Sequence, residues 1–93
     1  MSNDYEFEVR VKGIKGKCVF GHRVGDRIYF DCRSVKGKIC YDALLALLPY
    51  INAMRYGMNY PWAENKDLIP VACPDPDNLV VFEIKRIKNQ RND

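Results

Sequence analysis

The sequence contains no long hydrophobic run. Its longest apolar stretch, Ala43 to Leu48, is far shorter than the roughly 20 residues that a helix needs to cross a bilayer. The first eight residues, Met-Ser-Asn-Asp-Tyr-Glu-Phe-Glu, lack the apolar segment of a secretory signal peptide. We therefore expect a cytoplasmic protein that does not enter a membrane. Disulfide bonds are rare in that compartment, so the four cysteines point to metal binding, redox chemistry or burial.

Several catalytic signatures are also missing. The chain has no serine nucleophile elbow, no glycine-rich phosphate loop and no pair of carboxylates at helical spacing. It has no Cys-x-x-Cys pair either, which is the usual dithiol redox motif. Asp75 and Asp77 are interpreted as turn residues rather than as a catalytic pair. These absences favour a protein without enzymatic turnover, and they leave a cysteine-dependent activity as the alternative.

The charge is modest and divided. Lys and Arg number 15 against 12 Asp and Glu, which gives a net charge of +3. The positive residues fall into two clusters, Arg10 to Lys17 and Lys85 to Arg91, and the second is interpreted as a solvated terminus. Because nucleic-acid binding usually requires one clustered basic face, we do not expect a nucleic-acid partner.

The hydrophobic pattern predicts an α+β domain. Apolar and charged residues alternate from Tyr5 to Lys12, as in a half-buried strand. Shorter extended segments follow at 27–31 and 68–72, and a clear final strand spans 79–85. Pairing of the last strand with the first would give a small antiparallel sheet of four to five strands. The length indicates a single domain, 1–93, with flexible ends at 1–4 and 88–93.

One helical region lies between these strands. Leu, Ile and Met recur at helical spacing over about 41–56. Pro49 interrupts this pattern, because proline lacks the amide hydrogen that a helix interior uses. The sequence therefore predicts either one kinked helix or two short helices, packed on one face of the sheet.

The only histidine and three of the cysteines lie at boundaries between these elements. Cys18 and His22 stand in Cys-Val-Phe-Gly-His, Cys40 precedes the helix, and Cys73 precedes a proline-rich turn. Three thiolates and one imidazole are a donor set for zinc, or for iron or an iron–sulfur cluster. We therefore predict a metal site made of Cys18, His22, Cys40 and Cys73, with zinc as the first choice. Cys32, at a strand end, is a further candidate ligand that could replace His22 or Cys40.

Three other interpretations stay open from the residues alone. Free cysteines are often simply buried, so all of these positions could be packing residues. Cys40 at a helix start would have its thiolate stabilised by the helix dipole, which suits a thiol redox protein or a cysteine-dependent enzyme. The chain could instead be a protein-interaction module or a homo-oligomer whose cysteines are only structural. The apolar contact patch would then comprise Met54, Met58, Tyr60 and Trp62.

Several short motifs follow one another in a specific order along nearly the whole chain. They are Cys18-Val19-Phe20-Gly21-His22, Val24-Gly25-Asp26, Cys40, Leu48-Pro49-Tyr50, Arg55-Tyr56-Gly57, Pro61-Trp62 and Val71-Ala72-Cys73-Pro74-Asp75-Pro76. This order resembles a family of uncharacterised prokaryotic proteins of similar length. Members have proline where Val19 and Tyr41 stand here, and Cys32 falls outside the shared pattern. The resemblance implies that Cys18, His22, Cys40 and Cys73 form a common site, and it implies no particular activity.

Overall fold

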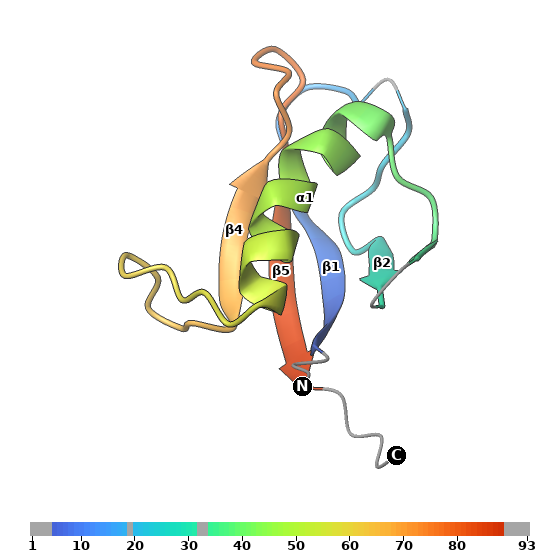
Figure 1. Cartoon of the computed structure of the whole chain (residues 1–93). Helices are drawn as coiled ribbons and strands as arrows, with labels where there is room; N and C mark the ends of the chain where they lie inside the picture. Colours follow the sequence, from blue (N-terminus) through green and yellow to red (C-terminus); the bar gives the residue numbers. More distant parts are fainter. Residues whose placement is uncertain (1–4, 19, 32–33, 89–93) are drawn as a thin grey trace.

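The structure is a computed structural model that describes residues 5–18, 20–31 and 34–88. These residues form a five-stranded antiparallel sheet, in the order β3-β2-β1-β5-β4, with one helix. In chain order the elements are β1 (Tyr5–Ile14), β2 (Arg27–Phe30), β3 (Val35–Lys36), α1 (Tyr41–Arg55), β4 (Leu68–Ala72) and β5 (Val80–Lys88). The helix lies across one face of the sheet (Figure 1), so the predicted α+β architecture is confirmed.

The longest strands, β1 and β5, form the centre of the sheet, as the sequence predicts. Their pairing extends from Tyr5 opposite Lys88 to Ile14 opposite Val80, with a bulge between Val11 and Gly13. Alternate residues of each strand face the helix and are buried, because side chains alternate between the two faces of a sheet. β5 extends to Lys88, and the remaining terminal residues, 1–4 and 89–93, lie outside the described part of the chain.

The helix is a single continuous element, although Pro49 lies inside it. Proline removes the hydrogen bond that the carbonyl of Leu45 would otherwise accept. Leu45 and Pro49 both lie on the exposed side of α1, so water can reach that carbonyl. Of the two predicted alternatives, the structure therefore has one helix rather than two. In the described residues, no helix combines the length and the apolar character that crossing a membrane requires.

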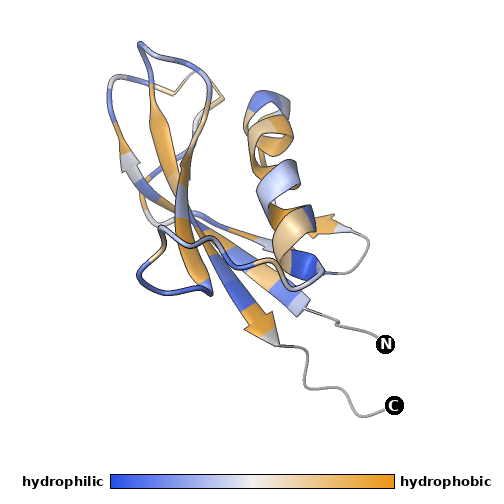
Figure 2. Cartoon of the chain, turned by 60° about the vertical axis from the view of Figure 1, so that its left-hand side comes forward, coloured by the Kyte–Doolittle hydropathy of each residue, from blue (hydrophilic) through white to orange (hydrophobic). Residues whose placement is uncertain are grey.

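The core lies between α1 and the sheet, and Figure 2 shows apolar residues on both sides of this layer. The helix contributes four buried side chains, those of Ala43, Leu47, Ile51 and Met54. Full burial of each of the three larger side chains stabilises the fold by about 1.5–3 kcal/mol. The predicted contact patch is therefore wrong for Met54, which is 0% exposed. Met54 follows Leu47 and Ile51 at helical spacing, so it belongs to the face that packs on the sheet, and that face extends to the last turn of the helix.

Arg86 is a buried charge on the inner face of β5. Its side chain is 2% exposed, so its assignment to a solvated terminal cluster is wrong. Nε donates to Asp67 Oδ1 at 2.8 Å, and the two terminal nitrogens donate to four further oxygens. Those acceptors are Met54 O at 2.9 Å, Met58 O at 3.0 Å, Asn59 Oδ1 at 2.6 Å and Lys66 O at 3.2 Å. The five N–H groups of a guanidinium are thus all used.

These contacts join three separate parts of the fold. Arg86 connects β5 to the last turn of α1 and to the 57–67 connection that follows it. The ring of Tyr5, from β1, lies 5.0 Å from the guanidinium carbon and covers the cation. A buried charge is tolerated only where such partners replace its water. Arg86 is therefore the residue that fixes the C-terminal end of the helix against the sheet.

We predict that Arg86→Lys lowers the free energy of unfolding by about 2–4 kcal/mol, because an ammonium group cannot reach all five acceptors. Urea denaturation followed by circular dichroism measures the loss. Arg10→Lys is the matched control, since Arg10 is 47% exposed in its ion pair with Glu83, and the cost there is expected to stay below about 1 kcal/mol. Equal losses in the two variants would contradict the assigned role of Arg86.

Candidate functional site

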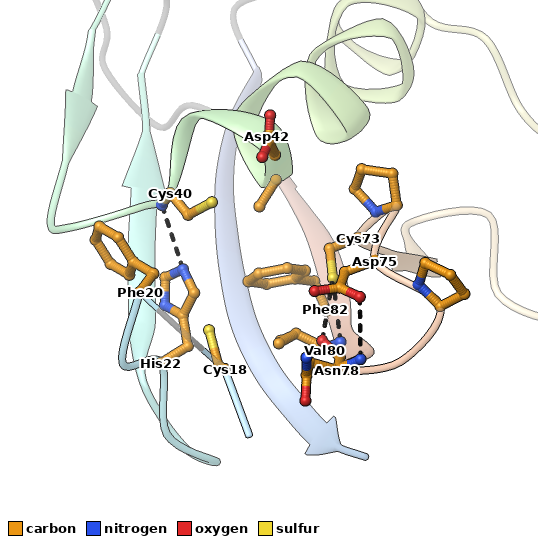
Figure 3. Close-up of a pocket in the computed structure, with 13 residues that line it drawn as sticks. Cys18, Phe20, His22, Cys40, Asp42, Cys73, Asp75, Asn78, Val80 and Phe82 are labelled. Carbon is orange, nitrogen blue, oxygen red and sulfur yellow. Dashed lines mark hydrogen bonds between the residues drawn. The ribbon is translucent and has the colours of Figure 1, made fainter. Parts of the chain in front are cut away.

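The four residues predicted to bind metal all line one cavity of about 370 Å³. The cavity lies at the end of the sheet where β5 begins and beside the first turn of α1 (Figure 3). Phe82, from β5, also lines it. Cys32, the further candidate ligand, lies outside the described residues.

Cys73 lies at the start of a closely hydrogen-bonded turn between β4 and β5. Its amide donates to Val80 O at 2.9 Å, and its sulfur accepts the amide hydrogen of Val80 at 3.2 Å. Within the turn, one carboxylate oxygen of Asp75 accepts the amides of Asp77 and Asn78 at 3.0 and 3.1 Å. The amides of Asn78 and then Asp77 hold the pKa of Asp75 below its usual value, because they stabilise the carboxylate. The interpretation of Asp75 as a turn residue is confirmed.

This turn is docked onto the segment that precedes Cys18. The amide of Lys17 donates to Asn78 Oδ1 at 2.9 Å. Gly16 has a φ of +83°, and a Cβ atom there would lie 2.6 Å from Asp77 O. Glycine is therefore required both for the backbone conformation and for the close approach of the two segments. The docking brings Cys18 and Cys73 to one cavity although they are distant in sequence.

His22 is buried, with 5% of its surface exposed. Its ring contacts Phe20, with centroids 4.5 Å apart, and meets the edge of Phe82 at 5.5 Å. Burial lowers the pKa of His22 and Asp26 partly offsets this effect, so the ring is neutral at neutral pH. Nε2 accepts the amide hydrogen of Cys40 at 3.3 Å. Since a neutral imidazole carries one proton, that proton is on Nδ1.

Cys40 is the N-cap residue of α1. Its backbone is extended, with φ −62° and ψ 139°, and its side chain makes no capping hydrogen bond. The sulfur points into the cavity (Figure 3). Asp42, in the first turn of the helix, also lines the cavity. The predicted position of Cys40 at the helix start is confirmed, and its thiol is left available for chemistry.

The four side chains share the cavity without surrounding a common point. Cys18, His22 and Cys40 lie on one side of the Phe82 ring and Cys73 on the other (Figure 3). Among the described residues, no group of three or more His, Cys, Asp or Glu side chains is placed to hold a metal ion. Cys18, Cys40 and Cys73 are free thiols. A metal ion would therefore have to draw the side chains together.

The cavity also contains two acidic residues that are not among the predicted metal ligands. Asp42 and Asp75 both line the cavity and supply its carboxylates. Each stands two residues after a candidate cysteine, Cys40 or Cys73, and this spacing is the signal in the sequence that could have placed them beside the thiols. In the sequence Phe82 has the pattern of a core residue of the last strand, and only the fold shows that its ring lines the cavity.

No protein-family model matches this chain, and searches of curated proteins and of solved structures found no match. The resemblance to the family of uncharacterised prokaryotic proteins therefore stays a prediction. The function of the chain is therefore inferred from the cavity and the residues that line it.

We predict that Gly16→Ala destabilises the protein by at least about 1 kcal/mol more than Gly25→Ala does. Both glycines have positive φ, so both variants carry the strain of a left-handed alanine. At Gly16 the added Cβ would collide with the 73–80 turn, whereas at Gly25 no other segment lies within 4 Å of the added Cβ. Urea denaturation of the two variants isolates the docking of the 73–80 turn. Equal stabilities would show that this close approach is not a constraint.

We also predict that His22 in the metal-free protein carries its proton on Nδ1. Long-range proton–nitrogen correlation spectra near neutral pH distinguish this tautomer from the other one. The amide of Cys40 should exchange with solvent more slowly than that of Tyr41, which is at the first helical position and has no intrahelical acceptor. A proton on Nε2 would exclude the observed hydrogen bond.

Proposed function

We propose that the cavity binds a metal through Cys18, His22, Cys40 and Cys73. Zinc is the first candidate, and iron or an iron–sulfur cluster is the alternative. The observation that carries this proposal is that all four line one cavity, although they come from three separate parts of the chain. Thiolate and neutral imidazole are the ligands that zinc prefers in proteins. Packing alone gives no reason for these residue types to meet at one place.

The surroundings of the cavity also suit a cation. The charged side chains that line it within the described residues are the carboxylates Asp42 and Asp75. Clefts lined by charge of one sign raise the local concentration of the opposite ion. Burial keeps His22 neutral, so its ring has a lone pair to offer without first losing a proton.

Metal binding through His22 requires one hydrogen bond to break. Coordination through Nε2 displaces the amide of Cys40 directly. Coordination through Nδ1 moves the ring proton to Nε2, which then faces the Cys40 amide hydrogen as a second donor. The bond and the metal therefore exclude each other at either nitrogen. The net value of a neutral hydrogen bond, about 1 kcal/mol, is small beside the free energy of zinc ligation.

A thiol enzyme centred on Cys40 receives less support from the geometry. Its base would be His22, whose Nε2 lone pair already accepts the amide of Cys40. A general base needs a free lone pair directed at the thiol. Transfer of the thiol proton to Nε2 would break the hydrogen bond from the Cys40 amide without supplying any binding energy in its place, whereas ligation of a metal ion does supply it.

An interaction module has a separate observation in its favour. Trp62 is 57% exposed and Met58 43% exposed. The ring of Trp62 contacts that of Tyr60, and Tyr60 contacts Tyr50, in tilted arrangements with centroids 5.3 and 5.6 Å apart. An exposed tryptophan whose ring is held by neighbouring rings is typical of residues that contact a partner protein. This surface lies apart from the cavity residues, so the two functions can be tested separately.

We predict that the protein, purified anaerobically without a histidine tag, binds about one zinc ion per chain, as four ligands require. Plasma mass spectrometry and competition with a chromophoric chelator measure stoichiometry and affinity. Cys18→Ser and Cys40→Ser should each weaken binding by at least about tenfold. Tyr56→Ser is the control and should retain wild-type affinity, since Tyr56 is exposed and does not line the cavity. Cys32→Ser tests whether the further candidate ligand takes part. Equal affinity in all the variants, or no zinc at all, would contradict the proposal.

A further inference from the structure

We infer that two copies of this chain associate through the outer face of α1, with the two helices antiparallel across a two-fold axis between Leu48 and Pro49. The proposed dimer requires no metal, so its test is independent of the cavity. Its surface also differs from the aromatic patch around Trp62. α1 lies on the outside of the molecule, and among the described residues no element covers its outer face (Figure 1, Figure 2).

The outer face of α1 is apolar, whereas a helix on the surface of a globular protein usually has a polar outer face. Tyr41 is 81% exposed, Leu45 67% and Tyr56, which directly follows the helix, 77%. Pro49 is also exposed, so these four side chains form one apolar stripe along the helix, and Asn52 is the polar residue within it. Single exposed apolar residues are common, but a continuous apolar stripe marks an interaction surface.

The apolar stripe matches a second copy of itself when the two helices are antiparallel. Tyr41 and Tyr56 are equally far along the chain from the position of the two-fold axis, and so are Leu45 and Asn52. The axis therefore brings Tyr41 of one copy level with Tyr56 of the other. Each contact is repeated on the other side of the axis, as a two-fold dimer requires.

The same alignment supplies a partner for a backbone carbonyl that the helix leaves unpaired. Pro49 has no amide hydrogen, so the carbonyl of Leu45 receives no helical hydrogen bond from it. The antiparallel alignment places Asn52 of the second copy level with Leu45, and an asparagine side chain carries two N–H donors. A carbonyl that leaves water needs a donor, and we expect the Asn52 amide to provide it. The polar residue of the stripe thus lies where a polar partner is required.

Charge also favours a second copy in the antiparallel orientation. The charged residues of α1 are Asp42 in its first turn and Arg55 in its last turn. Antiparallel helices place the acidic end of each copy beside the basic end of the other and oppose their dipoles, whereas parallel helices place like charges together. A membrane surface fits this face less well, because helices that lie on lipid carry several Lys or Arg residues beside their apolar face. α1 carries only one such residue.

The area of the stripe is sufficient for a reversible dimer. Because an aromatic side chain buries about 150–250 Å², the stripe offers roughly 500 Å² per copy and about 1,000 Å² per dimer, the lower limit of a specific interface. Interfaces of this size belong to transient complexes. We therefore expect a dissociation constant of about 1–100 µM for the dimer.

Sedimentation velocity of the full chain, kept reduced and free of metal by a chelator, measures the association over about 1–500 µM. Leu45→Lys places an unpaired charge inside the interface and should raise the dissociation constant at least about tenfold. Val24→Lys is the matched control, since Val24 is 64% exposed and lies outside α1, and it should leave the association unchanged. Circular dichroism shows whether both variants keep the fold.

Asn52→Leu tests the hydrogen bond and the register. Leucine adds apolar area but no donor, so the carbonyl of Leu45 stays unpaired in the dimer and association should weaken several-fold. Tighter association would overturn the register. Isotope-filtered nuclear Overhauser spectra of mixed labelled and unlabelled chains measure the orientation, and they should connect Tyr41 of one copy to Tyr56 of the other. Contacts between the two copies of Tyr41 would mean parallel helices and would overturn the antiparallel dimer.

Three further results would overturn the dimer through α1. A chain that stays monomeric up to about 500 µM leaves the apolar stripe to a different partner. Equal loss of association in Leu45→Lys and Val24→Lys means that the contact is not specific to α1. Loss of association in Trp62→Ala, together with full association of Leu45→Lys, places the interface at the aromatic patch instead.

Discussion

The buried guanidinium of Arg86 is the constraint on which the arrangement of helix and sheet depends. A cation enclosed in the protein has lost its water, so five acceptors must replace that water at fixed positions. Those acceptors belong to the end of α1 and to the 57–67 connection, which includes Asp67, so the network fixes how both meet β5. Apolar packing alone would allow the helix to slide along the sheet, whereas the directed hydrogen bonds do not. The opposite end of the same helix carries Cys40, so the placement of the cavity follows in part from a contact at the far end of α1.

The cavity end is fixed by a second set of constraints that involves backbone more than side chains. Gly16 allows the 73–80 turn to approach the segment before Cys18, and Asn78 holds it there. His22 is enclosed by aromatic rings and bonded to the amide of Cys40. Every thiol and imidazole of the cavity is thus attached to a well-determined stretch of backbone. The side-chain torsions remain the adjustable part, and these are what a bound metal would change.

Much of the fold can be predicted from the sequence, because period-two alternation and helical spacing report directly which face of an element is buried. Four of the five strands, the helix and the pairing of β1 with β5 follow from that rule. The two-residue strand β3 has both residues exposed and lies in a segment that the sequence indicates as a turn. The burial of Arg86 could not be predicted, since a charged side chain is solvated in most proteins and only tertiary contacts reverse this. The shared cavity of Cys18, His22, Cys40 and Cys73 follows from residue type. Their division by Phe82 and the His22–Cys40 bond depend on rotamers and loop geometry, which no spacing encodes.

The same hydrogen bonds explain how a metal site of this kind can belong to a fold that does not require the metal. In a zinc finger, the apo chain has no core, and ligation supplies the free energy of folding. Here a continuous core joins the helix and the sheet, and the polar cavity groups of His22 and Cys73 already have partners within the protein. Binding of a metal at the proposed site would replace satisfied contacts instead of filling empty ones, so each broken bond would subtract about 1 kcal/mol from the affinity.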